Sequence, residues 1–303
     1  MKKNNYHTII DFGKEKIRLA VFNKDSKNIF SISKEIQKKE NYDEHSKSLN
    51  YLIRIAEKKI SSHLNNVTVL FDHSQFYSVD ISIKKEFDQP TNLKETYASL
   101  LQEANLLIFN NYLKDKIIHI IKIKSIFDGK DFYEDTLDDK KAKSIIVELK
   151  FLCLNLKIYE NISNIFKKNN LEIINFYCSS YIKSYSYINF FSKKDNVTFL
   201  DIGSERSTII FYNKNKSVFF NSIPIGGNHI TKDISKILKL TFEESEKIKK
   251  TFNKSEIEFS FDQNMNKEKK KLIQQIIGKN ISIDLLKKVV LARVEEIIFL
   301  SLK

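Results

Sequence analysis

The feature that most constrains this 303-residue chain is a short pattern that occurs twice, at residues 8–23 and 196–213. The first copy reads TIIDFGKEKIRLAVFN and the second reads NVTFLDIGSERSTIIFYN. Aligned without a gap from Thr8 and Thr198, five of sixteen positions are identical. In each copy, apolar residues lie on both sides of an Asp-x-Gly turn, which predicts a β-hairpin. A duplicated hairpin of this kind predicts two related domains.

Glycine is scarce in the chain, and its placement indicates where the backbone needs unusual geometry. Four of the six glycines fall in three short turns, at Gly13, at Gly203 and at the pair Gly226-Gly227. A tight turn can direct several backbone N–H groups at one anion, and a nearby aspartate can hold Mg²⁺ through water. Single Asp-x-Gly turns are common in ordinary hairpins. The matched duplication and the separate glycine pair favour two hairpins that clamp a nucleotide.

The first part of the chain has an α/β pattern. Strands are predicted at 8–12, 17–23, 27–34 and 67–72, with a helix over 46–64. Residues 79–150 differ and predict an inserted α+β module. Its predicted elements are a strand at 78–83, a helix after an Asn92–Glu95 capping box, and strands at 116–127 and 144–154.

The α/β pattern then resumes. The predicted elements are helices near 157–168 and over 179–191, a strand at 171–177, the second hairpin, and helices over 242–252 and 282–303.

Composition narrows the class of protein. A formal charge of +13 is spread along the chain, in a sequence rich in Lys, Asn, Ile and Phe, so it does not by itself predict a specific nucleic-acid partner. Cys153 and Cys178 lie in apolar surroundings without metal-ligand spacing and indicate core thiols of a reduced compartment. The start has no signal peptide and no apolar run reaches membrane-span length, which predicts a cytoplasmic protein.

Taken together, the motifs resemble a known family. The hairpins are similar to the two phosphate motifs of the actin-like ATPase superfamily, and the closest resemblance is to the FtsA family of bacterial cell-division proteins. That family runs DIGxGTT, PxGGxxITxDIA and AExIK, where this chain has DIGSERST, PIGGNHITKDIS and SEKIK. VVLARVEEIIFL resembles its IxxRxEEI helix, and IIHIIKIKSIFDG resembles its 1C subdomain.

The resemblance implies a fold class: α/β, with actin-like (ribonuclease-H-like) duplicated domains and an inserted small α+β subdomain. The first domain, 1A, would comprise residues 1–78 and 151–197, and the 1C-type insertion residues 79–150. The second domain, 2A, would be incomplete and comprise residues 198–240. The outer subdomain, 2B, would comprise residues 241–303.

The resemblance also implies a site for ATP and Mg²⁺. Asp11 and Asp201 would lie near the metal and contact it through water, and the two hairpin turns would line the phosphates. Glu246 and Lys249 would reach the ribose and base, although their i, i+3 spacing also fits an ordinary salt bridge. The implied nucleotide-binding residues are Asp11, Gly13, Lys14, Lys16, Arg18, Asp201, Gly203, Ser204, Gly226, Gly227, Glu246 and Lys249.

Several residues depart from the family pattern. Lys14 replaces a hydroxyl residue, Arg18 replaces a phosphate-contacting lysine, and Glu205 and Arg206 replace glycine and threonine. Lys14, Lys16, Arg18 and Arg206 would still supply positive charge. We therefore expect ATP binding with weak or absent hydrolysis.

The family continues beyond the last predicted helix into a further strand, a second GG turn and a membrane-binding helix. We expect a truncated product or a natural short form, with any membrane contact indirect or peripheral. Glu295 and Glu296 in the last helix favour core packing over membrane insertion.

The implied function is an adaptor of bacterial cell division. It would bind the C-terminal peptide of FtsZ through residues 241–303, contact other division proteins, and self-associate into filaments through the inserted module. It would act in the cytoplasm, at the inner face of the cell membrane at the division site. Two alternatives remain: a PilM-like pilus or secretion adaptor, and an actin-fold small-molecule kinase. The kinase needs a catalytic aspartate in the first domain, for which the sequence shows no motif. His119 and His229 are assigned no role.

Overall fold

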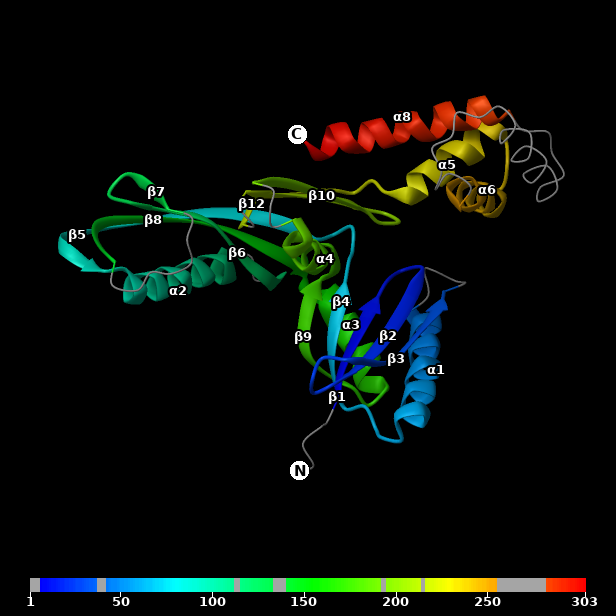
Figure 1. The fold of residues 1–303 in the computed structure, drawn as a ribbon, viewed down its shortest axis with the longest axis horizontal. Helices are drawn as coiled ribbons and strands as arrows, with labels where there is room; N and C mark the ends of the chain where they lie inside the picture. Colours follow the sequence, from blue (N-terminus) through cyan, green and yellow to red (C-terminus); the bar gives the residue numbers. More distant parts are fainter. Residues whose placement is uncertain are drawn as a thin grey trace. The chain divides into compact units, whose positions relative to one another are not determined.

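A computed structural model describes residues 6–36, 42–111, 115–132, 140–191, 195–213, 216–254 and 282–303 (Figure 1). The chain divides into two compact units. Unit 1 comprises Met1–Phe199 with Ile209–Phe220, and unit 2 comprises Leu200–Thr208 with Asn221–Lys303. Residues 255–281, between the last two predicted helices, lie outside the described residues.

Unit 1 is built around a five-stranded sheet in the order β3-β2-β1-β4-β9. The strands β1, β2 and β3 form an antiparallel meander, whereas β4 runs parallel to β1 and β9 runs parallel to β4. The predicted first hairpin, third strand and buried fourth strand are confirmed. The five strands are β1 (Tyr6–Phe12), β2 (Lys16–Asn23), β3 (Asn28–Glu35), β4 (Asn66–Phe71) and β9 (Glu172–Cys178).

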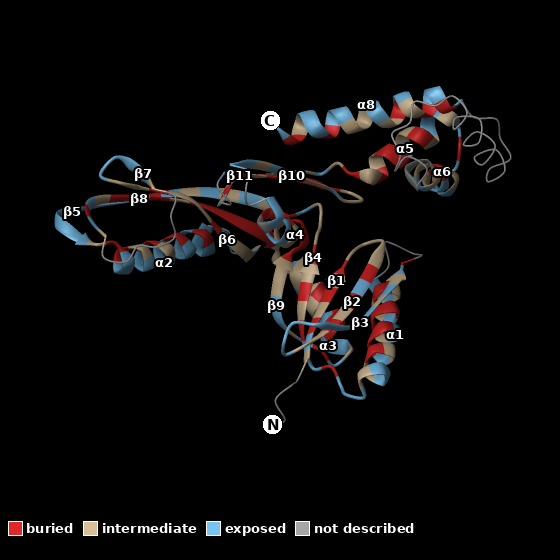
Figure 2. Ribbon diagram, in the orientation of Figure 1, coloured by how far each residue is buried: buried red, intermediate tan, exposed pale blue. Residues whose placement is uncertain are grey.

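Three helices accompany this sheet. Helix α1 (Tyr42–Ile60) packs against β2 and β3, α3 (Leu156–Lys168) packs against β9, and α4 (Ser179–Ile188) packs against β4 and β9. A short 3₁₀ turn, η1 (Asn189–Phe191), follows α4. Figure 2 shows buried residues in a stripe along α1, as expected for an amphipathic helix at the edge of a core. Leu49, Leu52, Ile53 and Ala56 of α1 are buried, and Leu64 is buried beyond the end of the helix.

A second sheet carries the inserted module, in the order β5-β8-β6-β7. Its core lies between α2 and this sheet, where Leu93, Leu100, Ala104 and Ile108 of the helix are buried. Asn92 caps α2 as predicted, although its side chain accepts from the Lys94 N–H at 2.9 Å and not from that of Glu95. The elements are β5 (Tyr77–Asn92), α2 (Leu93–Asn111), β6 (Asp115–Phe127), β7 (Lys130–Phe132) and β8 (Lys141–Asn155).

His119 connects the inserted sheet to the five-stranded sheet. Its Nε2 accepts the Cys178 N–H at 2.9 Å, and its ring lies 5.6 Å from that of Tyr177 and 4.9 Å from that of Tyr181. Burial lowers the pKa of His119 to about 4, so the imidazole is neutral and can accept this hydrogen bond near pH 7. The histidine therefore has a structural role at the junction of β6 and β9.

The second hairpin belongs to a three-stranded sheet, β10 (Asn196–Ile202), β11 (Ser207–Asn213) and β12 (Lys216–Ile223), which crosses the boundary between the units. Three helices follow in unit 2: α5 (Gly227–Leu238), α6 (Phe242–Lys254) and α8 (Ile283–Ser301). Ile234, Ile248 and Leu286, one from each helix, are fully buried in their shared core. Arg293 of α8 also binds Asp233 of α5 with two N–H groups, at 2.6 and 3.0 Å. Within the described ranges, no helix is long and apolar enough to span a membrane.

Candidate functional site

The two Asp-x-Gly turns have the same local geometry. A Cβ atom on Gly13 would lie 2.8 Å from the Lys16 carbonyl oxygen, and one on Gly203 would lie 2.9 Å from the Arg206 carbonyl oxygen. In the second turn, the Gly203 N–H donates to the same Arg206 oxygen at 2.9 Å. Each glycine is therefore required by the close approach of its own turn. The turn geometry alone accounts for glycine at both positions, whether or not a ligand binds there. The phosphate role of both turns stays a prediction.

Asp11 is held by two neighbours in unit 1. It lies opposite Arg18 in the β1–β2 register, and the Arg18 Nη1 is 2.9 Å from its Oδ2. The Ser179 hydroxyl, at the start of α4, donates to the other carboxylate oxygen at 3.4 Å. The Asp11 side chain is only 18% exposed.

This arrangement disfavours Asp11 as a direct magnesium ligand. A guanidinium already neutralises the carboxylate, and a second cation beside it would be repelled. Among the residues that the structure describes, no three His, Cys, Asp or Glu side chains come together as metal ligands. The predicted magnesium role of Asp11, through water, stays a prediction. The same role for Asp201, a half-buried residue near the end of β10, stays a prediction.

In unit 2, the Gly226-Gly227 pair packs directly on the second turn. The Gly227 N–H donates to the Gly203 carbonyl at 2.8 Å, and the Asn228 N–H donates to the Ser204 carbonyl at 2.7 Å. Gly226 lies so close that a Cβ atom would come within 2.4 Å of the Gly203 oxygen. Two of the amides that begin α5 are thus satisfied by the turn. The glycine pair has a packing role that the sequence did not indicate, and its approach to a nucleotide stays a prediction.

His229 closes the start of α5. Its side-chain Nδ1 accepts the Gly226 backbone N–H at 3.2 Å, and the His229 backbone N–H donates to the Gly226 carbonyl at 2.9 Å. The sequence suggested no partner for this histidine. Its position at the third residue of the helix is the signal that predicts a capping interaction.

Glu246 and Lys249 lie on one face of α6, as their spacing predicts, but they are more than a surface pair. Their side chains are 2.7 Å apart and 13% and 22% exposed. Thr231 of α5 donates its hydroxyl to Glu246 at 2.6 Å, and Lys249 also donates to the Gly227 carbonyl at 2.9 Å. Burial raises the pKa of Glu246, but the hydrogen bonds from Lys249 and Thr231 outweigh it, so the pKa is lowered. The pair therefore connects α6 to the first turn of α5, and its ribose and base contacts stay predictions.

The remaining predicted residues differ in exposure. Lys14, Lys16 and Ser204 are partly exposed near the two turns. Arg206, which we expected to add positive charge to the site, is only 3% exposed. Its guanidinium cannot meet an incoming phosphate unless the turn rearranges.

Sequence reasoning missed a polar group at the carboxyl ends of β4 and β9. The Ser180 hydroxyl donates to Asp72 Oδ2 at 2.6 Å, and the His73 N–H donates to Asp72 Oδ1 at 3.1 Å. Ligands of open α/β sheets bind at this edge, which is also where Asp11 lies. The signal was present, because Asp72 directly follows a buried strand and Ser180 lies in the first turn of a helix.

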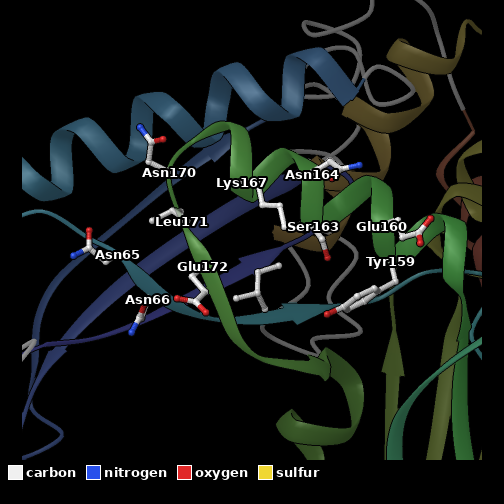
Figure 3. Close-up of a pocket in the computed structure, with 11 residues that line it drawn as sticks. Asn65, Asn66, Tyr159, Glu160, Ser163, Asn164, Lys167, Asn170, Leu171 and Glu172 are labelled. Carbon is white, nitrogen blue, oxygen red and sulfur yellow. The ribbon is translucent and has the colours of Figure 1, made fainter.

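A cleft of about 1010 Å³ lies at the other end of the same strands (Figure 3). Asn66 and Glu172 begin β4 and β9 on one side of it, and Tyr159, Ser163 and Lys167 of α3 line the other. None of the predicted site residues lines this cleft.

Comparison with solved structures identifies the class of fold. A solved structure of the PilM–PilN type IV pilus biogenesis complex matches with a TM-score of 0.60 and 11% sequence identity, covering 98% of both chains. At that identity the likeness shows the fold alone. Together with the duplicated hairpins and the strand order of unit 1, it defines a protein of the actin-like ATPase fold.

Sequence comparison gives a more specific similarity than the fold does. Residues 198–292 match the family model of cell division protein FtsA. The cell division protein FtsA of Staphylococcus epidermidis is 22% identical over 187 residues, which cover 61% of this chain and 40% of that protein. The FtsA of Bacillus subtilis is 27% identical over 136 residues, covering 44% and 30%. These matches thus span less than half the length of either relative. Over these parts of its length, the chain is similar in sequence to the cell division protein FtsA.

Proposed function

We propose that this chain is an assembly adaptor of bacterial cell division that binds nucleotide and the C-terminal peptide of FtsZ. The observation that carries the proposal is the FtsA match over residues 198–292. That stretch includes nearly all of the second hairpin, the glycine pair, the Glu246–Lys249 pair and the first half of α8. Proteins of this fold generally bind nucleotide with Mg²⁺, and the FtsA relatives are named for their part in cell division.

Helix α8 offers a surface for the FtsZ peptide. One face is fixed to α5 by Arg293 and by buried apolar residues. The other face exposes large apolar side chains, with Leu291 57% and Phe299 59% exposed. Apolar side chains grouped on the solvent face of a helix favour contact with another protein. We assign this α8 face to the peptide, with self-association through the inserted module and contact with other division proteins at the division site.

In this proposal the nucleotide acts as a conformational ligand. The turn at Gly203, held by α5, would present the backbone to phosphate, and Glu246 and Lys249 would lie close to the ribose and base. Glu205, an acidic residue in the same turn, disfavours a third phosphate there, which supports slow or absent hydrolysis. Assembly, and not turnover, would then be the output.

The test is the binding of a fluorescent FtsZ C-terminal peptide, measured by anisotropy. We expect saturable binding by the full chain, and a loss of roughly tenfold in affinity for Leu291→Ser or Phe299→Ser, as for the removal of one apolar contact. Leu106→Ser is the matched control, because Leu106 is 60% exposed on α2, outside the proposed surface. A wild-type chain that does not retain the peptide, or an equal loss in the control, would rule the proposal out.

A second candidate is a PilM-like adaptor of pilus or secretion assembly. It is favoured by the fold likeness to the PilM–PilN complex, which extends over almost the whole of both chains. The FtsA sequence match supports the division role more directly. If the chain bound a PilN-derived peptide more tightly than the FtsZ peptide in the same assay, the pilus or secretion role would be favoured over the division role. The kinase alternative has no supporting observation of this kind.

A further inference from the structure

The cleft beside α3 is lined almost entirely by polar side chains. Its volume is about 1010 Å³, the size of a site for a small molecule, and such sites usually have mainly apolar walls. Here nine of the eleven lining residues carry a polar or charged group, and the other two are Leu171 and Ile173 (Figure 3). All eleven belong to unit 1. A wall of this composition favours a ligand whose own surface is mostly polar.

One wall of the cleft is a face of α3. Tyr159, Ser163 and Lys167 follow each other at a spacing of four residues, which places them on the same side of the helix. Figure 3 shows Tyr159 and Ser163 projecting from α3 toward the strands. The Tyr159 ring packs edge-on against Phe176, with ring centres 5.1 Å apart, and the Lys116 Nζ lies 5.5 Å from the centre of the Tyr159 ring. The Tyr159 hydroxyl is therefore held at a fixed place in the wall.

Hydrogen bonds fix the walls of the cleft before any ligand binds. Asn169, at the C-terminal end of α3, donates to the Ser46 hydroxyl of α1 at 3.2 Å and accepts from the Asn50 side chain at 3.0 Å. On the strand side, the Glu172 N–H donates to the Asn65 carbonyl at 2.7 Å. A site whose walls are already fixed loses less conformational entropy when a ligand binds. The cleft is thus preorganised.

The hydrogen-bonding groups of the lining match the chemistry of a hydroxyl group. Each of Asn65, Asn66 and Asn164 presents an amide that both donates and accepts, and the Tyr159 hydroxyl does the same. The Ser163 Oγ is buried in the middle of α3 and has no hydrogen-bond partner among the described residues. Rotation about one side-chain bond would turn it toward the cleft, where a ligand hydroxyl would satisfy it.

Charge discriminates between the kinds of polar ligand. Glu160 and Glu172 bring two carboxylates to the cleft, and Lys167 brings one ammonium group. Two carboxylates repel a phosphate group, although the formal charge of +13 on the whole chain attracts anions at longer range. Leu171 and Ile173 add a small apolar surface for C–H groups. The cleft therefore favours a ligand with several hydroxyl groups, some C–H surface and no negative charge.

We propose that this cleft of unit 1 binds an unphosphorylated sugar. A sugar ring carries hydroxyl groups that donate and accept, and these replace water molecules at the same polar partners. Its C–H groups pack on Leu171 and Ile173. The cleft shares no lining residue with the sites assigned to nucleotide and to the FtsZ peptide, so this inference does not depend on the proposed function.

The experiment compares three probes that have the same ring and differ in charge: glucose, glucosamine and glucose 6-phosphate. Saturation-transfer difference NMR detects weak ligands, and titration of each sugar into the full chain gives its dissociation constant. We expect saturable binding of glucose and glucosamine, with dissociation constants on the order of 1 mM. Glucose 6-phosphate should bind roughly fivefold more weakly, because its phosphate meets the two carboxylates.

Two variants test the location of the site. Ser163→Ala and Asn164→Ala should each weaken glucose binding by roughly fivefold, as for the loss of one hydrogen bond. Asn105→Ala is the matched control for Asn164→Ala, because it removes an amide from an exposed position of α2 outside the cleft. Urea unfolding gives a second readout. Ser163→Ala should keep or increase the free energy of unfolding, since no described residue bonds its hydroxyl.

Glucose binding that is weakened in both cleft variants and unchanged in Asn105→Ala would support the proposal. Absence of saturable binding by both glucose and glucosamine would overturn it. Glucose 6-phosphate that binds as tightly as glucose would overturn the exclusion of phosphorylated sugars. An equal loss in Asn105→Ala and Asn164→Ala would refute the cleft as the place where the sugar binds.

Discussion

Replacing Gly226 with alanine should destabilise unit 2 severely. The new Cβ atom would lie 2.4 Å from the Gly203 carbonyl oxygen and 2.8 Å from the Arg206 backbone nitrogen. Both are backbone atoms of a tight turn, so neither can rotate away. Overpacking of this kind costs about 1–3 kcal/mol, and each backbone hydrogen bond that α5 loses as it shifts costs about 1 kcal/mol. We expect a loss of roughly 3–5 kcal/mol in the free energy of unfolding of unit 2.

The neighbouring glycine supplies the control. A Cβ atom on Gly227 would lie 3.5 Å from the Lys249 Nζ and 3.6 Å from the Gly203 oxygen, which are ordinary contact distances. Gly227 is the first residue of α5, where alanine loses less conformational entropy on folding than glycine does. Gly227→Ala should therefore be neutral or stabilise unit 2 by up to about 1 kcal/mol.

Hydrogen exchange followed by mass spectrometry would measure both variants, because it reports on α5 and the second turn separately from unit 1. Urea unfolding followed by circular dichroism would give the overall change. Gly226→Ala should lose protection in the second turn and α5, and Gly227→Ala should keep it. Equal protection in both variants, or a larger loss in Gly227→Ala, would refute the argument that contact with the turn determines the need for Gly226.

Two further predictions concern buried polar groups of unit 1. Burial lowers the pKa of His119 from 6.5 to about 4, so the unfolded chain takes up the proton at a higher pH than the folded chain does. The contribution of neutral His119 to the free energy of unfolding is therefore fully present above pH 6.5 and is lost as the pH falls to about 4. The loss in the free energy of unfolding should be roughly 3 kcal/mol. His119→Gln should abolish this part of the pH dependence, which urea titrations of the variant and the wild type near pH 7 and near pH 4.5 would measure. Ser184 and Tyr212 share a buried hydrogen bond at 2.7 Å, so Ser184→Ala should cost about 1–3 kcal/mol by leaving the Tyr212 hydroxyl unsatisfied. Tyr212→Phe in that background should recover part of the loss, and strictly additive costs in the double-mutant cycle would contradict the pairing.

Local features of the fold could be predicted from the sequence. Strands β1 and β2 and helix α1 agree with their predictions within a few residues, because turn chemistry and apolar spacing act over short distances. The Asp128-Gly129 turn is another case. Both residues have positive φ, 47° and 79°, as a two-residue hairpin turn requires.

Contacts between elements were harder to predict, since they depend on tertiary packing. The sequence placed Glu246 and Lys249 on one helical face but could not show that this face meets Thr231 and Gly227 of α5. It also predicted that Arg206 supplies positive charge to the site, but Arg206 is only 3% exposed. The packing of α5 on that turn coincides with the burial of Arg206, and no periodicity in the sequence indicates it.

The two copies of the duplicated pattern show this limit most directly. Ile10 and Phe12 of β1 are 0% and 1% exposed, whereas the aligned Ile202 of β10 is 39% exposed. The difference follows from the neighbours, since β1 lies between β2 and β4, and β10 pairs only with β11 among the described strands. The turns nevertheless agree closely, with almost the same approach of a carbonyl to each glycine. The repeated residues therefore specify the turn, and the burial of each strand depends on what packs beside it.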